Sequence, residues 1–183
     1  MPLNHTSQHS ELTEDQYAAL GKAVVEWANI EELLGAVVGR LLATPDFLAR
    51  SFTDAMSAVR VQTVLTQAIE IHRVRYQCRL VRENFLDELT AINAKVTALR
   101  TTRNRIAHFC WMRTNDDELW GTNFSGGMPS PKKEKHGYTT LTMTDLSALH
   151  DKSYTVVEQL LSILEQLPKV KEETLLTSPI AGP

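Results

Sequence analysis

The sequence predicts a mainly α-helical protein, an up-and-down four-helix bundle with a small β-hairpin insertion between the third and fourth helices. Two observations predict the helices. Apolar residues recur at alternating steps of four and three along three long segments, as they do on one face of an α-helix. Glycine and proline, the strongest helix breakers, are absent between Pro45 and Gly121. A third observation predicts the insertion, because residues from about 109 to 143 include segments with aromatic and β-branched side chains.

The first helix is predicted to begin at Thr13 and to end before Pro45. Thr13 and Gln16 fit a capping box, in which each side chain accepts a hydrogen bond from a backbone N–H at the start of the helix. The stepwise pattern then runs through Leu20, Val24, Trp27, Glu31, Leu34, Val38 and Leu41. It is widened by Ile30, Leu33, Val37 and Leu42. A stripe this wide predicts a central helix that is buried on much of its surface.

A second helix is expected from Asp46 or Asp54 to about Arg75, and a turn from about Tyr76 to Arg82. Its apolar side comprises Phe52, Met56, Val59, Val61, Leu65, Ala68 and Ile69. The third helix follows, with its apolar positions at Phe85, Leu89, Ile92, Val96, Leu99, Arg103 and Ile106. Six of these seven positions are apolar, and the exception is an arginine.

The β insertion is predicted in three short segments, Phe109–Met112, Leu119–Phe124 and Tyr138–Met143, with a loop at Ser125–Gly137. The fourth helix is predicted to be capped by Thr144, with Asp145 favourable in its first turn, and to stop at Pro168. Its core positions are Leu146, Leu149, Ser153, Val156, Leu160, Ile163 and Leu167.

The expected organisation is a flexible arm at 1–12, a single helical domain at 13–167 and a mobile tail at 168–183. The chain has 183 residues, 43% of them hydrophobic and 22% charged, with a net charge of −3. It therefore lacks a global basic field, and any nucleic-acid binding needs a local patch. We expect a cytoplasmic protein without membrane association. The chain has only two cysteines, its first residues do not resemble a signal peptide, and it has no apolar run long enough to span a membrane.

Two charged residues, Glu31 and Arg103, occupy positions where the helical pattern calls for apolar side chains. One interpretation is a buried structural salt bridge between the two helices. The other is that Arg103 faces an anion and Glu31 orients it, since a planar guanidinium grips phosphate through two hydrogen bonds.

His108 lies about 140° around an ideal helix from Arg103 and stacks over Asn104. Arg103 and His108 therefore share a site only if the helix unwinds near His108, or if the long arginine reaches across. The alternative for His108 is a basic residue that stabilises a helix C-terminus.

The segment Arg103-Asn104-x-x-Ala107-His108 resembles the R-x4-H motif of the HEPN superfamily (higher eukaryotes and prokaryotes nucleotide-binding). The segment Trp27-x-x-Ile30-Glu31 and the apolar last helix after a β insertion are similar to members of this group as well. The resemblance covers roughly residues 13–167.

The resemblance implies a metal-independent endoribonuclease, often a toxin or defence effector, that dimerises so that two motifs meet in one cleft. Arg103 would stabilise the transition-state phosphate, Asn104 would position His108, and His108 would act as general acid and base. The RNA 2′-hydroxyl would attack the adjacent phosphate and leave a 2′,3′-cyclic phosphate. HEPN toxins paired with a nucleotidyltransferase antitoxin carry a tyrosine two positions after the histidine. Cys110 stands there in this chain, which puts silencing by adenylylation in doubt.

Other signals have two interpretations each. One signal is a run of arginines without an acidic residue among them, Arg73, Arg75, Arg79 and Arg82. This run either contacts an RNA backbone or belongs to a solvated turn. Arg75, Arg79 and Arg82 are expected on one helical face. Lys132, Lys133 and Lys135 lie in the insertion loop. His108 and Cys110 alone make a poor metal site, so neither metal nor cofactor is expected.

The expected partners are RNA, a second copy of the chain, and an antitoxin or other protein. The alternative function is a non-catalytic helical bundle that binds a partner or acts as a scaffold.

Overall fold

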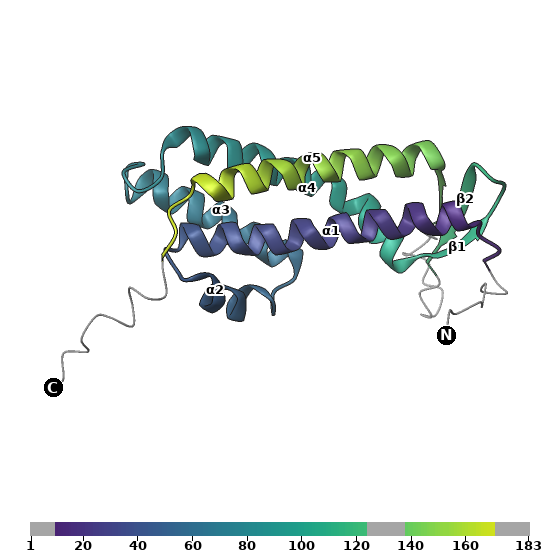
Figure 1. Ribbon diagram of the computed structural model, residues 1–183, viewed down its shortest axis with the longest axis horizontal. Helices are drawn as coiled ribbons and strands as arrows, with labels where there is room; N and C mark the ends of the chain where they lie inside the picture. The colour runs from purple at the N-terminus through teal and green to yellow at the C-terminus, as the bar shows by residue number, and fades with distance from the viewer. Residues whose placement is uncertain (1–9, 124–137, 171–183) are drawn as a thin grey trace, which may run out of the picture. The chain divides into compact units, whose positions relative to one another are not determined.

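The computed structural model describes residues 10–123 and 138–170, which form a mainly helical protein (Figure 1). The helices within these residues are α1 (Glu14–Leu41), α2 (Asp46–Thr53), α3 (Ala58–Val74), α4 (Glu83–His108) and α5 (Met143–Gln166). The strands are β1 (Cys110–Arg113), β2 (Glu118–Thr122) and β3 (Tyr138–Thr142). The predicted loop at 125–137, with its three lysines, and most of the predicted arm and tail lie outside the described residues.

The predicted second helix is two helices, so the described chain has five helices where the sequence predicted four. The break is made by Ser57, whose extended backbone (φ −68°, ψ 153°) starts a new helix and whose hydroxyl accepts from the backbone N–H of Arg60. A turn precedes it, in which the N–H of Met56 bonds the carbonyl of Thr53 at 2.9 Å. Serine is a preferred N-cap residue, and this cap outweighs the apolar pattern that continues through it.

The start of α1 confirms the predicted capping box. The backbone N–H of Thr13 donates to Oε1 of Gln16 at 3.0 Å, and the N–H of Gln16 donates to Oγ1 of Thr13 at 3.2 Å. The buried stripe differs in part from the prediction, because Val24 and Leu42 are exposed. Because the apolar stripe is wide, more than one set of positions at alternating steps of four and three residues fits it. The structure buries Ala23, Trp27, Ile30, Leu34, Val37, Val38 and Leu41.

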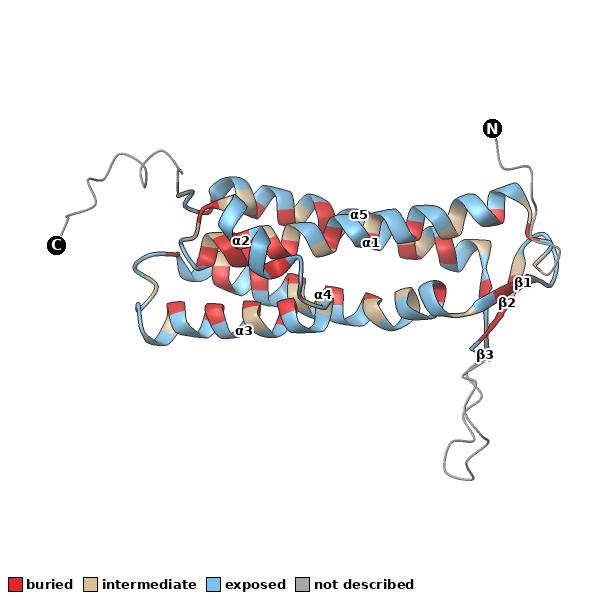
Figure 2. Cartoon of the chain, turned by 90° about the horizontal axis from the view of Figure 1, so that it is seen from below, coloured by how far each residue is buried: buried red, intermediate tan, exposed pale blue. Residues whose placement is uncertain are grey.

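All seven predicted core positions of α5 are buried, as the red segments of that helix show in Figure 2. The predicted cap at Thr144 is wrong, since Thr142 caps the helix. The N–H and hydroxyl of Thr142 both donate to Oδ2 of Asp145, at 2.9 and 2.7 Å, and the N–H of Asp145 donates back to Oγ1 of Thr142 at 3.0 Å. The helix begins earlier because β3 ends at this threonine and leads directly into it.

The insertion is a three-stranded antiparallel sheet in the order β1-β2-β3, rather than a hairpin. Trp111 on β1 pairs with Gly121 on β2, and its ring lies so close that a Cβ on Gly121 would stand 2.7 Å from it. Glycine is therefore required at position 121, because any side chain would displace the tryptophan.

The chain forms two compact units. Unit 1 contains the first half of α1 up to Trp27, the end of α4, the sheet and the start of α5; unit 2 contains the rest of these helices with α2 and α3. The largest fully buried side chains include Trp27, Leu119 and Leu146 in unit 1, and Ile30, Leu34, Leu65, Leu86, Leu89, Ile92, Leu160 and Ile163 in unit 2. None of the helices in the described ranges combines the length and apolar character needed to cross a membrane.

Candidate functional site

The end of α4 in unit 1 carries the predicted site, and the helix stays intact through it. The N–H of Phe109 donates to the carbonyl of Arg105 at 2.9 Å, so the last turn is closed. The indole N–H of Trp111 donates to the carbonyl of Ile106 at 3.1 Å, which satisfies one of the last four carbonyls of the helix. Of the two ways in which Arg103 and His108 could share a site, unwinding of the helix is therefore excluded, because Trp111 on β1 holds this turn in helical geometry.

Arg103 is half-buried and lies over the ring of Trp27. Its guanidinium carbon stands 5.3 Å from the centre of the indole, within range of a cation–π contact. Nη1 of Arg103 also donates to Oδ1 of Asn104 at 3.3 Å. Trp27 itself is 1% exposed, so it is a rigid support for the guanidinium.

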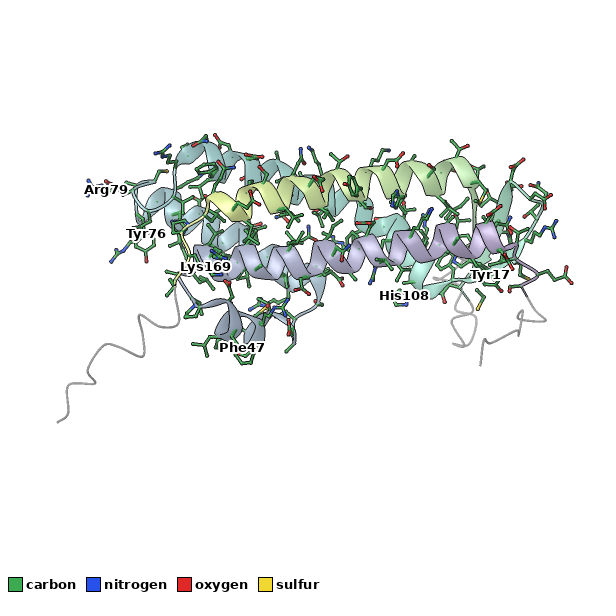
Figure 3. The ribbon with its side chains drawn as sticks, in the orientation of Figure 1. Tyr17, Phe47, Tyr76, Arg79, His108 and Lys169 are labelled. Atoms are coloured by element: carbon green, nitrogen blue, oxygen red, sulfur yellow. The ribbon has the colours of Figure 1, made fainter. Side chains whose placement is uncertain are left out.

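Asn104 and His108 are exposed and one helical turn apart on α4. Figure 3 labels His108 with its ring pointing away from the helix. Arg103 and Asn104 are brought into contact, whereas His108 has no hydrogen bond to either of them among the described residues. Since the helix is intact, Arg103 and His108 keep their separation of about 140° around it.

Glu31, predicted to support Arg103, is half-buried in unit 2 on the second half of α1. Its pairing with Arg103 stays a prediction. Within unit 1, the contact that orients the guanidinium comes from Trp27, one helical turn earlier on α1. The sequence offered no signal for this contact, because a buried tryptophan on a helix is most simply a core residue.

The arginines of the α3–α4 turn belong to unit 2 and do not share one helical face as predicted. Helix α3 ends at Val74, and Gln77 and Cys78 have positive φ values of 49° and 56°, which breaks the helical spacing. Arg73 is ion-paired with Glu83 at 3.0 Å and with Asp87 at 2.6 Å. The remaining members of the run, Arg75, Arg79 and Arg82, are exposed.

The same turn contains a thiol–carboxylate contact. Sγ of Cys78 donates to Oε2 of Glu83. This hydrogen bond is the largest cause of a raised pKa for the Cys78 thiol and of a lowered pKa for the Glu83 carboxyl. A thiol in this state is a poor nucleophile, so Cys78 is not a candidate for covalent catalysis.

A feature missed in the sequence prediction is the lack of acidic residues from Leu89 to Asn115. The part of this stretch in unit 1 carries Arg100, Arg103, Arg105 and Arg113. Arg113 is paired with Asp116 at the β1–β2 turn. Nη1 of Arg105 lies 3.5 Å from Oγ1 of Thr139 on β3, next to Tyr138, which is 72% exposed. A count of charges along the chain would have revealed this local basic patch.

Unit 1 also contains a polar cleft of about 330 Å³ between the first turns of α1 and α5. His150 lines it, with Nε2 at 3.9 Å from Oε1 of Glu26 and Nδ1 at 3.4 Å from Oδ1 of Asp151. None of the motif residues of α4 lines this cleft. The described residues also include no group of three or more histidine, cysteine, aspartate or glutamate side chains placed to hold a metal ion.

We compared the chain with protein-family models, with curated proteins and with solved structures, and none of them matched it.

Proposed function

We propose that this chain is a metal-independent endoribonuclease of HEPN type whose site comprises Arg103, Asn104 and His108. One observation carries the proposal: a guanidinium supported by Trp27 stands beside an exposed Asn104–His108 pair on an acid-free stretch of α4. This places an oriented cation and an accessible acid–base group on one helix end, in a locally positive field.

The proposed reaction needs no group beyond these side chains and the RNA. A histidine acting as base takes the proton of the 2′-hydroxyl, and the 2′-oxygen forms a bond to the adjacent phosphorus. The bond from phosphorus to the 5′-oxygen breaks, and that oxygen receives a proton from an imidazolium. Arg103 binds the phosphate as its charge develops, and Asn104 orients the imidazole. The products are a 2′,3′-cyclic phosphate and a 5′-hydroxyl.

We place the active site in a homodimer. Because α4 is helical through His108, Arg103 and His108 of one copy lie about 140° apart around it, and only an arginine that reaches across would bring both to the same phosphate. A second copy resolves this if His108 of that copy lies across from Arg103 of the first. The site is then composite, and each dimer contains two sites related by a two-fold axis.

The test is incubation of the purified protein with total RNA in the presence of EDTA. We expect the wild type to cleave, and His108→Ala to reduce the rate by about 10²–10⁴-fold, as for loss of a general acid–base group. Arg103→Ala is expected to cost on the order of 10²–10³-fold, by analogy with loss of a transition-state donor. Arg60→Ala, an exposed arginine on α3 of unit 2, is the control and should retain activity. A wild type that leaves RNA intact, or folded variants that cleave normally, contradicts the proposal.

The cellular setting we propose is a cytoplasmic toxin or defence effector. Both cysteines, Cys78 and Cys110, are free thiols, as expected for a protein of a reducing compartment. Growth arrest on induction, relieved by His108→Ala, supports a toxin. Because Cys110 stands where a modifiable tyrosine is found in paired HEPN toxins, we expect an antitoxin to act by binding rather than by adenylylation.

The second candidate is a non-catalytic binding or scaffold protein. The observation that favours it is the contact of Arg103 with Trp27, which gives the arginine a structural role without RNA. On this alternative, Arg103→Ala lowers the unfolding temperature while the wild type leaves RNA uncleaved. The RNA assay combined with thermal unfolding of the same variants separates the two candidates.

A further inference from the structure

In unit 2, large apolar side chains are exposed on α2 and on the chain just before and after it, and this group is called here the α2 surface. At least half of the surface of each residue is accessible, and Phe47 reaches 77%. Figure 3 shows Phe47 projecting from the helix away from the rest of the chain drawn there. The α2 surface consists of Leu42, Phe47, Leu48, Phe52 and Val59.

This exposure is fixed by the way α2 packs on α1. A Cβ placed on Gly39 would stand 2.5 Å from Cβ of Ala49, and one on Gly35 would stand 3.0 Å from Oγ1 of Thr53. The two glycines thus allow the small side of α2 to lie directly against α1, where Ala49 and Thr53 are buried. Phe47 and Leu48 remain on the far side of α2 and cannot turn inward without breaking this contact, whereas Phe52 flanks it.

An apolar cavity lies beside the same helix. It measures about 250 Å³ and its lining includes Val38, Leu42, Phe52, Met56 and Val64. A cavity of about 150 Å³ with an apolar lining is already enough to bind benzene. The α2 surface therefore combines a protruding phenyl ring with a hollow that can receive one.

A knob and a matching hollow on the same patch make a surface self-complementary. In a two-fold dimer, Phe47 of each copy enters the cavity of the other, so that neither Phe47 remains exposed and no further copy can be added through this surface. We infer that the α2 surface is the interface through which two copies of this chain associate. The proposed function also needs a homodimer, but the inference rests on the α2 surface alone and does not depend on RNA cleavage.

The area agrees with what a dimer needs. An aromatic side chain has a surface of about 150–250 Å², and that of Leu or Val is somewhat smaller. Multiplied by the exposed fractions of its five residues, these areas give the α2 surface roughly 500 Å² of exposed apolar area. A standard interface buries roughly 800 Å² per partner, about 65% of it apolar in homodimers. The α2 surface thus supplies most of the apolar area that one partner contributes.

Several of the charges around the α2 surface are paired within the chain. Arg40 donates to Asp46 at 3.0 Å, Lys169 lies 3.2 Å from the same carboxylate, and Arg50 pairs with Glu32. Charges that are neutralised within one copy repel the identical pairs of a second copy little, so they permit contact between the two.

The test is the mass of the purified full chain in solution, measured by light scattering or sedimentation at micromolar concentration. We expect the wild type at twice the 20.6 kDa of one chain. Phe47→Asp should weaken association by at least about thirtyfold, the effect of losing an interface hot spot, and leave a monomer. Because Phe47 is so exposed within one copy, this variant should keep a single cooperative unfolding transition, which shows that it is folded.

Val25→Asp is the matched control, since Val25 is an exposed apolar residue of α1 in unit 1. It should remain dimeric. A monomeric wild type overturns the inference and indicates that another protein covers the α2 surface. A Phe47→Asp variant that stays dimeric overturns it too, because the copies must then meet elsewhere. A monomeric wild type would also contradict the composite active site, whereas a Phe47→Asp variant that stays dimeric would leave that site untouched. RNA cleavage is measured separately.

Discussion

At the residue scale, the central contact is that of Arg103 with Trp27. A planar guanidinium stacks on an indole and still presents N–H groups along its edge, whereas a lysine ammonium is a compact point charge. The identity of the cation at position 103 therefore matters beyond its sign. The neighbouring Asn104 accepts one of the guanidinium N–H groups at 3.3 Å and adds to this orientation.

We predict that Arg103→Lys destabilises the protein by about 0.5–2 kcal/mol, the range of cation–π contacts from exposed to desolvated sites. Chemical unfolding at neutral pH measures this change. Arg105→Lys is the control, because Nη1 of Arg105 makes, among the described residues, only a long contact with Oγ1 of Thr139, at 3.5 Å, and the effect of this change on stability should be small. Equal losses for the two variants would show that Trp27 does not stabilise Arg103.

A second prediction concerns the cap of α5. Hydrogen bonds from the backbone and side chain of Thr142 lower the pKa of Asp145 below its ordinary value of 3.8. A carboxyl whose pKa is lowered by folding stabilises the fold above its unfolded pKa, and this contribution disappears as the pH falls through the folded pKa. Asp145→Asn should therefore cost about 0.3–1 kcal/mol at pH 7, typical of a charge at a helix N-terminus.

The measurement is urea unfolding of Asp145→Asn and of the wild type at several pH values from 7 down to about 3, around the ordinary pKa of aspartate. The difference in unfolding free energy between the two proteins should become smaller as the pH falls toward 3. Glu158→Gln, an exposed change on the same helix, controls for loss of one charge. A gap that stays constant with pH would refute the role of the Asp145 carboxylate.

A third prediction compares the two thiols. The hydrogen bond to Glu83 raises the pKa of Cys78, so its thiolate is scarce near neutral pH, while Cys110 is exposed. A disulfide reagent should therefore label Cys110 first, as read by mass spectrometry of the digested protein. Glu83→Gln should speed the labelling of Cys78 and leave Cys110 unchanged. Unchanged labelling of Cys78 would contradict the contact.

At the element scale, the elements that follow one pattern were predicted well. The core positions of the last helix, the turn between α3 and α4, and the capping box of α1 are all present. In α4, five of the seven predicted positions are buried, while Phe85 and Arg103 are half-buried. Failures occurred where two local signals compete. Ser57 caps a new helix inside an apolar pattern, and Thr142 caps α5 because it also ends β3. Such a choice depends on tertiary contacts that one sequence window does not contain.

The packing of α2 on α1 gives a prediction at this scale. The same substitution, glycine to alanine, is made at two positions of α1. Gly39→Ala should destabilise by about 1–3 kcal/mol, the range for overpacking, because its Cβ meets Ala49 at 2.5 Å. Gly21→Ala, with nothing within 4 Å of its Cβ, should stabilise by about 0.5–1 kcal/mol through better helix propensity. Thermal unfolding tests both. Stabilisation by both changes would mean that α2 does not lie against α1 as described.

At the scale of the whole molecule, the predicted site residues lie in unit 1, except for Glu31 and the arginines of the α3–α4 turn, which lie in unit 2. The sequence predicted Arg103, Asn104 and His108 from a charge in an apolar pattern and from the motif. It did not predict the support from Trp27, because that contact joins residues far apart in the chain. It left open whether the helix unwinds at His108, and the structure shows that Trp111 keeps α4 helical.

That intact helix leads to the central claim, which is a site composed of Arg103 from one copy and His108 from another. Subunit complementation tests it most directly. Arg103→Ala and His108→Ala, each inactive alone, are mixed in equal amounts after mild dissociation, and RNA cleavage is measured with EDTA present. Half of randomly formed dimers are mixed and each has one intact site, so the mixture should recover about a quarter of the wild-type activity. Activity no higher than that of the separate variants would contradict the composite site.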